Sequence, residues 1–208
     1  MRRYLPVFPL GNPLLPTQIL PLHIFEDRYR ALMETLTGFG STAEMGVVLI
    51  ERGSEIGGGE MRVPVGTVAH LIESERLVDG RWIAIFAGSH RFRVERWLPD
   101  DPYPQAEVVE EADGDWDEAD ARRLAEAEQA VRTALELASQ LGDGSVNPAF
   151  SLDPEPIRRT WELCVRAPVG PLDRQRLLEA PNRSERLDLL VQQVADVSAL
   201  LAFRLHGR

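Results

Sequence analysis

The spacing of apolar residues changes near Asp113, and this change limits the folds open to the chain more than any other feature. Before Asp113, apolar residues occur in short runs separated by Pro, Gly and Asp turn signals, which is typical of β-strands. After Asp113 they recur every three or four positions over long stretches, which indicates amphipathic helices. We therefore expect an α+β protein with a β subdomain over residues 1–112 and a helical subdomain over residues 113–208.

Short β-branched and aromatic runs dominate the first subdomain, and one helix, expected over residues 25–37 and ended by Gly38, interrupts them. Turn signals at Asp79-Gly80, Gly88-Ser89 and Asp100-Asp101-Pro102 separate the later runs. The expected strands cover residues 5–10, 18–22, 44–51, 65–77, 81–87, 90–97 and 105–111. Runs at this spacing suggest a closed or half-closed barrel.

Four helices with apolar stripes are expected in the second subdomain, where they form a four-helix bundle. Capping boxes at Asp115-x-x-Glu118 and Asn182-x-x-Glu185 mark two helix starts, and Asp153 before Pro154 marks a third. The expected helices cover residues 115–141, 153–167, 171–180 and 182–205.

Arginine supplies all 23 basic residues, because the sequence contains no lysine. A P-loop lysine, a Ser–Lys peptidase dyad and a Schiff-base lysine are therefore excluded within this sequence. The net charge is −10 and neither half is basic, so binding to nucleic acid or to a membrane lacks its main electrostatic energy. No apolar run approaches the roughly 20 residues that cross a bilayer, and no signal peptide is visible, so we expect a cytoplasmic protein.

Reactive side chains are present, but their spacing does not indicate a metal site or a catalytic centre. Cys164, the single cysteine, falls at an apolar position of an expected helix and is interpreted as a core thiol. His23 lies where a strand gives way to a helix, and we expect it to bond a backbone carbonyl. The histidines lack the spacing of a zinc motif; they are His23, His70, His90 and His206.

Two further motifs are also given structural interpretations. Ser89 and His90 are strand neighbours, so we expect them to point to opposite faces and not to act as nucleophile and base. Gly57-Gly58-Gly59 precedes an expected strand and not a helix, which favours a flexible hairpin loop over a phosphate site. We expect no metal, no cofactor and no enzymatic activity.

Three blocks of the sequence resemble one known family. They are "PVFPLGNPLLPTQILPLHIFEDRYRALM" at 6–33, "VGTVAHLIESERLVDGRWIAIFAGSHRFRVERW" at 65–97 and "LLEAPNRSERLDLLVQQV" at 177–194. Together they resemble the amino-terminal substrate-recognition domain of Lon proteases, and by this resemblance the domain is similar also to the corresponding part of cereblon-type substrate receptors. Thr17 departs from the family pattern, which has glycine after the proline, so we expect that turn to differ.

The resemblance implies a PUA-like β-barrel followed by a helical bundle. Lon proteases continue into an ATPase module and a Ser–Lys peptidase module, and we expect both to be absent because the sequence ends at Arg208 without a lysine. The resemblance therefore implies a stand-alone, non-catalytic module that binds protein or peptide.

We expect its partners to be unfolded or extended polypeptide and a separate ATPase or protease. Candidate contact regions are the 52–60 loop and the loop from Trp97 to Tyr103, and the candidate contact residues in or next to them are Ile56, Met61, Trp97 and Tyr103. The alternative is a PUA-like domain that binds a small ligand. RNA, which PUA-like barrels bind elsewhere, is opposed by the acidic charge.

Overall fold

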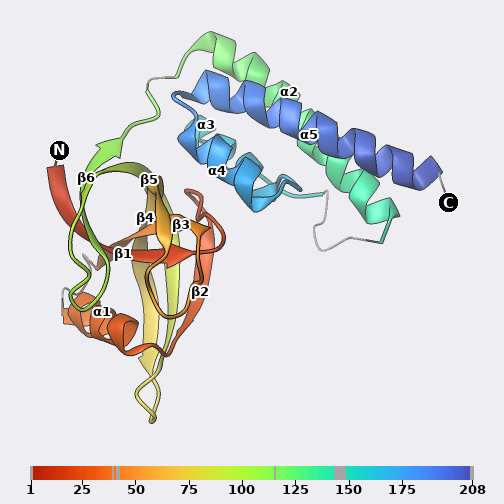
Figure 1. Cartoon of the computed structure of the whole chain (residues 1–208). Coiled ribbons are helices and arrows are strands. Elements are labelled where there is room, and N and C mark those ends of the chain that lie inside the picture. Colours follow the sequence, from red (N-terminus) through yellow and green to blue (C-terminus); the bar gives the residue numbers. More distant parts are fainter. Residues whose placement is uncertain (1, 39, 41–42, 115, 143–148, 207–208) are drawn as a thin grey trace. The chain divides into compact units, whose positions relative to one another are not determined.

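The structure is a computed structural model, and it describes residues 2–38, 40, 43–114, 116–142 and 149–206. The chain divides into two compact units, Met1–Ala112 and Asp113–Arg208, and each is described by itself. Strands and helix α1 form the first unit, and helices form the second (Figure 1). The mixed α+β class expected from the sequence is confirmed.

Six strands and one helix make up the first unit. Its elements are β1 (Arg2–Leu10), β2 (Ile19–Ile24), α1 (Asp27–Gly38), β3 (Glu44–Arg52), β4 (Met61–Arg76), β5 (Trp82–Trp97) and β6 (Gln105–Glu111). The strand order is β2-β5-β4-β3-β1-β6, and β6 also pairs with β5, so five strands close into a ring. Strand β2 stands outside this ring and pairs along one edge only, with the first part of β5.

The turn expected at Gly88-Ser89 is wrong, because β5 runs through this position without a break. Gly88 is needed for close approach: a Cβ there would lie 2.3 Å from the backbone oxygen of Leu15. The Gly88 N–H donates to the Gln18 oxygen at 2.8 Å, and the Thr17 N–H donates to the Gly88 oxygen at 2.9 Å. Thr17 itself has a φ of 70°, a conformation that favours glycine. The contact therefore fixes the segment before β2 against β5.

Two apolar clusters fill the first unit. Helix α1 covers one cluster with Tyr29, Leu32, Met33 and Leu36, and the Tyr29 ring stacks on Phe8 with 4.2 Å between centroids. The other cluster surrounds Phe92 and consists of Leu5, Val7, Val48, Val68, Phe92, Ala106 and Val108. Gly46 and Gly66 make room for the Phe92 ring, since a Cβ at either position would lie within 3 Å of it.

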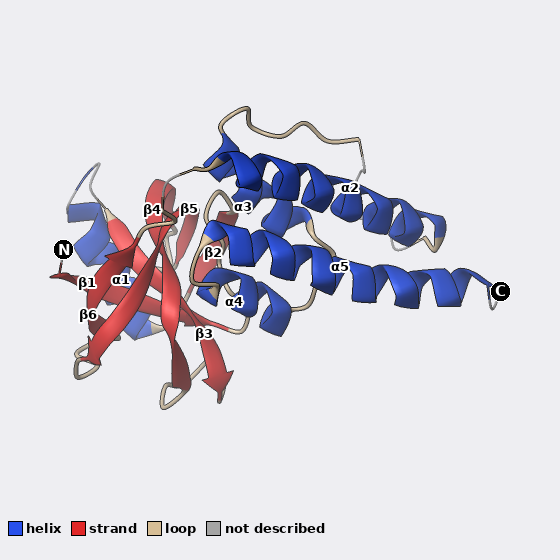
Figure 2. Cartoon of the chain, turned by 90° about the horizontal axis from the view of Figure 1, so that it is seen from above, coloured by secondary structure: helices blue, strands red, loops and turns tan. Residues whose placement is uncertain are grey.

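Four helices are described in the second unit. They are α2 (Glu118–Gln140), α3 (Pro156–Arg166), α4 (Pro171–Glu179) and α5 (Arg183–His206). The two long helices, α2 and α5, lie side by side in both views (Figures 1 and 2). No helix among the described residues is long and apolar enough to cross a membrane.

Two helix starts differ from the sequence interpretation. Asp117 caps α2 by accepting from the Asp120 N–H, and the expected cap Asp115 lies outside the described residues. Glu155 caps α3, while Asp153 accepts from the Glu155 N–H in the preceding turn. At each start, two carboxylates two residues apart could cap the helix, and the conformation of the preceding turn decides which of them does.

A buried arginine organises the helical unit. Arg186 has no exposed surface, lies 3.9 Å above the Trp161 ring, and pairs with Asp113 at 2.9 Å. Its Nε also donates to the Leu177 oxygen at 2.9 Å. A buried cation needs such partners, because removing one of them leaves an uncompensated charge. Cys164 lies in the same core, and burial raises the pKa of its thiol to about 12, as expected for a core thiol.

We predict that Gly88→Ala lowers the free energy of unfolding by about 2–3 kcal/mol, because the added methyl group meets backbone at Leu15. Urea denaturation followed by far-UV circular dichroism measures the change. Gly38→Ala is the matched control, since nothing lies within 4 Å of its Cβ position and it ends a helix. Equal stability of the two variants would contradict the close approach.

Candidate functional site

Within the described part of the chain, strand β2 has a strand partner along one backbone edge and none along the other. Its register pairs Pro21 with Ile85 of β5, and proline has no N–H to give to a ladder. The Gly88 N–H donates to Gln18, so the even-numbered residues of β2 face β5. Ile19, Pro21 and His23 therefore direct their backbone groups away from β5, and their side chains are exposed.

The last residues of β1 lie across from the unpaired edge of β2, because residues of both strands line one hollow. Val7 donates its N–H to the Pro104 oxygen and not to β3, and the alternation of the strand gives Pro9 the same direction. Two residues further on, the Gly11 N–H donates to the Glu55 carboxylate. The edge of β1 that carries Pro9 and the edge of β2 that carries Pro21 therefore do not pair with each other.

Two hollows lie along this opening and together form what we call the β2 groove. The first, about 150 Å³, is lined by residues of β1, β2, the start of α1 and the loop between β3 and β4, including Phe8, Leu10, Leu22, Phe25, Tyr29 and Ile56. The second, about 190 Å³, continues past Asn12, Pro13, Leu14, Gln18 and Leu20. Leu10, Leu22 and Glu55 line both hollows and therefore mark their junction. The groove is mainly apolar and follows β2 from Leu20 to Ile24.

The loop over residues 53–60 lies along the groove and is held by three hydrogen bonds. Glu55 accepts from the Gly11 N–H through its carboxylate and from Arg28 through its backbone oxygen, at 3.3 Å for the latter. The Gly57 N–H donates to Glu26 at 3.2 Å. Left-handed glycines at 53, 57, 58 and 59 allow the loop to fold back in this way. The glycine cluster thus serves a loop conformation, and among the described residues no group of three or more metal-binding side chains is found.

Charges near the groove are mostly compensated within the protein. Glu26 lies 3.3 Å from the Arg28 guanidinium, and the buried Glu60 carboxylate lies 2.7 Å from Arg62. Arg28 also lies 4.4 Å above the Tyr29 ring. Burial, the largest effect, raises the pKa of Tyr29, so its phenol stays neutral at physiological pH. The floor of the groove is therefore apolar and neutral, with ion pairs around it.

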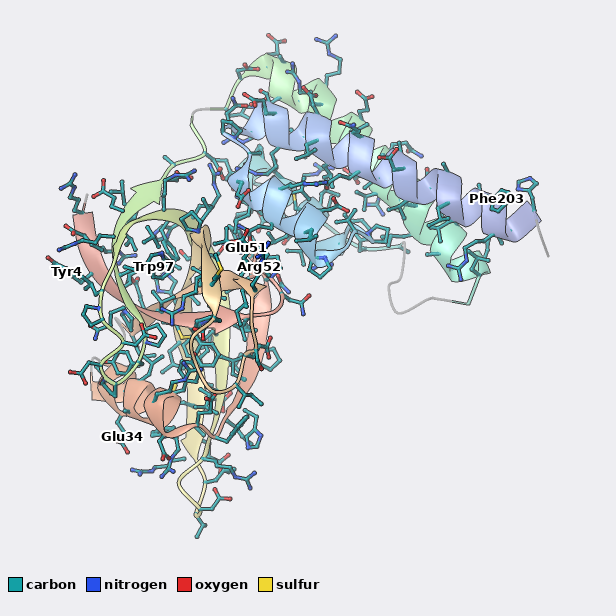
Figure 3. The ribbon with its side chains drawn as sticks, viewed as in Figure 1. Tyr4, Glu34, Glu51, Arg52, Trp97 and Phe203 are labelled. Atoms are coloured by element: carbon teal, nitrogen blue, oxygen red, sulfur yellow. The ribbon has the colours of Figure 1, made fainter. Side chains whose placement is uncertain are left out.

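The residues predicted from sequence lie in different places. Ile56 lines the first hollow and is 61% exposed. Met61 is exposed at the start of β4, and it does not line either hollow. Trp97 (Figure 3) is half-buried against the Phe92 cluster, with Arg62 5.4 Å above its ring. Tyr103 packs against the other cluster and donates to Thr35 at 3.2 Å. The structure thus brings only Ile56 of these four to the groove.

His23 and Phe25 line the groove, although sequence reasoning gave neither a binding role. The expected backbone bond of His23 is absent among the described residues: its exposed imidazole makes a tilted ring contact with Phe25, 6.2 Å between centroids. The available signal was Pro21, since a proline in the middle of a strand indicates a free edge. Exposed Ile19, Pro21 and His23 alternate with more buried residues, which supports that interpretation.

Ser89 and His90 do not point to opposite faces as expected. The Ser89 hydroxyl lies 2.9 Å from His90 Nδ1, because both residues fall where the β4–β5 register shifts and the strand alternation breaks. His90 Nε2 lies 3.4 Å from Glu110 and from Arg3. This polar cluster lies outside both hollows, so we assign the groove, and not the cluster, as the candidate site.

Comparison with known proteins identifies relatives across the whole chain. The family model "ATP-dependent protease La (LON) substrate-binding domain" matches residues 4–196. Lon protease 2 of Herpetosiphon aurantiacus is 26% identical over 203 residues, covering 94% of this chain and 24% of that protein. A Lon protease of Xanthomonas oryzae pv. oryzae is 28% identical over 219 residues, covering 98% of this chain and 24% of that protein. The chain spans about a quarter of the length of these relatives.

Two solved structures share the fold. A Lon N-terminal domain protein from Xanthomonas campestris superposes with a TM-score of 0.62 at 24% identity, covering 91% of this chain and 98% of that one. The N-terminal domain of a Mycobacterium avium complex Lon protease superposes with a TM-score of 0.66 at 16% identity, covering 93% and 99%. At these identities the likeness concerns the fold alone.

We predict that the amides of Ile19 and His23 exchange with solvent much faster than those of Leu20 and Leu22, by about a hundredfold or more. The reason is that the N–H groups of the first two point away from β5, whereas those of the other two point toward it. Amide hydrogen exchange followed residue by residue by NMR measures the difference. Equal protection along β2 would show that its outer edge is already paired.

Proposed function

The chain belongs to the family of LON substrate-binding domains, and from this premise we propose that it binds extended or unfolded polypeptide without acting on it chemically. The binding site is the β2 groove. In this proposal a peptide segment lies along β2 and pairs with its free backbone edge, while alternate side chains enter the two hollows.

One observation carries this proposal: an unpaired strand edge runs beside two apolar hollows. Backbone pairing recognises any extended chain regardless of sequence, and side-chain pockets add preference. An unpaired edge strand can associate with other chains, and proteins limit this with proline residues and with short edge strands. Pro21 and the six residues of β2 fit that pattern, so the edge suits transient and not permanent pairing.

Exposed apolar residues at the groove support the same function. Phe25 is 49% exposed and Ile56 is more exposed still, so both present apolar surface to solvent at the first hollow. Burying such side chains against a bound segment contributes about 1 kcal/mol or more each. An unfolded polypeptide supplies the apolar residues that such burial requires.

The alternative of a small-ligand site is less well supported. Pockets for drug-sized molecules usually enclose about 300–1,000 Å³, whereas the two hollows are about 150 and 190 Å³ and are joined end to end along a strand. Two small hollows joined end to end suit an extended chain better than a compact molecule. A separate ATPase or protease as a second partner remains part of the proposal.

We also propose the finer fold assignments made from the sequence. The pairing of β5 with β6, which closes five strands into a ring, supports a PUA-like barrel. The apolar faces of α2 and α5, which pack together, support a four-helix bundle formed with α3 and α4. We further propose that the two units are separate domains with a boundary between residues 112 and 113.

We predict that Phe25→Ser and Ile56→Ser each weaken binding of an unfolded protein about fivefold, because each removes apolar surface from the first hollow. Fluorescein-labelled, reduced and carboxymethylated α-lactalbumin is the probe, and fluorescence anisotropy gives the Kd. Both residues are exposed, so the free energy of unfolding should change little.

Ile72→Ser is the matched control, because Ile72 is 58% exposed on β4 and does not line the groove. Its Kd should equal that of the unchanged protein. If Ile72→Ser weakens binding as much as the groove variants, the attraction is a general property of the apolar surface and the proposed site is wrong.

A further inference from the structure

Glu55 occupies the junction of the two hollows. It is one of three residues that line both, and the other two, Leu10 and Leu22, are apolar. Its carboxylate accepts from the Gly11 N–H, which places the acid group at the edge of β1 and across the groove from β2. A side chain bound between the hollows would therefore lie next to this carboxylate.

The Glu55 carboxylate differs from those of the neighbouring acids: among the residues that the structure describes, its partner is a backbone amide and not a cation. Glu26 is paired with Arg28, and Glu60 is paired with Arg62. Arg28 contacts Glu55 only through the backbone oxygen. A carboxylate that accepts one hydrogen bond retains further acceptor positions, so Glu55 can receive a cation while it keeps the Gly11 bond.

The position of Glu55 between the two hollows indicates which residue of a bound peptide would carry such a cation. Side chains at positions i, i+2 and i+4 of an extended chain lie on one face, and each is about 6.6 Å along the chain from the next. The hollows flank Glu55, so apolar side chains at i and i+4 fill them and the side chain at i+2 faces the carboxylate. A hollow of about 150 Å³ matches a cavity that accepts a benzene-sized group, so it has room for one apolar side chain.

We propose that the groove selects extended segments with an apolar residue, a basic residue two positions later and a second apolar residue two positions after that, and that Glu55 reads the basic residue. This selectivity rests on the proposed function and specifies its substrate class. The net charge of −10 adds long-range attraction for basic segments. Salt should reduce the preference, since the pair is partly exposed to solvent.

Four labelled peptides, acetylated and amidated and flanked by serine, test the proposal. Their cores are Phe-Ser-Arg-Ser-Leu, Phe-Ser-Gln-Ser-Leu, Phe-Ser-Glu-Ser-Leu and the shifted Phe-Arg-Ser-Ser-Leu. Fluorescence anisotropy at low salt should show the first peptide binding about two- to fivefold tighter than the glutamine peptide. The shifted peptide has the same composition, but its arginine points to the other face, so it should bind like the glutamine peptide.

Variants of Glu55 separate its charge from its shape. Glu55→Gln keeps an oxygen for the Gly11 N–H and should abolish the arginine preference, and Glu55→Arg should reverse it in favour of the glutamate peptide. Glu51→Gln is the control, because it removes one negative charge at the end of β3, outside the groove lining (Figure 3). The control should retain the full preference.

Equal binding of the four peptides, or an equal effect of Glu51→Gln and Glu55→Gln, would overturn the role of Glu55 and leave the proposed function intact. Tight binding of the shifted peptide would overturn the spacing. No binding by any peptide overturns the inference, and the assay with unfolded α-lactalbumin then decides whether the proposed function fails with it.

Discussion

Pro9 and Pro21 lack the N–H groups that would join β1 and β2, and the candidate site depends on this missing pair of donors. Each proline lies on a strand edge that faces away from its ladder partner, β3 for the first and β5 for the second. A proline on an edge removes one donor and so weakens pairing along that edge. The sheet closes through β5 and β6, and a groove lies between β1 and β2.

The arginines serve different roles in the two units of the protein. In the helical unit, Arg186 is enclosed by Trp161, Asp113 and backbone oxygens, so it acts in packing. Near the groove, Arg28 and Arg62 neutralise Glu26 and Glu60 and hold the 53–60 loop in place. The carboxylate of Glu55 is directed to a backbone amide instead. The same balance that stabilises the loop therefore concentrates one negative charge in an apolar groove.

Local sequence patterns predicted most of the secondary structure. The capping residue Asn182 accepts from the Glu185 N–H at 2.9 Å as expected, and Gly142 adopts a φ of 81° after α2. The predictions were wrong where long-range contacts or strand pairing, and not the local pattern, decide the conformation. Gly88 looked like a turn, yet its missing Cβ serves a contact with Leu15, a residue 73 positions away in sequence order. Ser89 and His90 broke the expected alternation because a register shift is a property of two paired strands and not of one.

The sequence by itself determined the family, the change from strands to helices near Asp113, and the absence of lysine, because these follow from local periodicity, from motifs of contiguous residues and from composition. It also placed Ile56 among the candidate contacts. Only the tertiary structure decided that Ile56 and Glu55 meet Leu10, Leu22 and Phe25 in one groove. The physical reason is that strand register and the hydrogen bonds of the 53–60 loop join distant positions, and no local pattern contains that information.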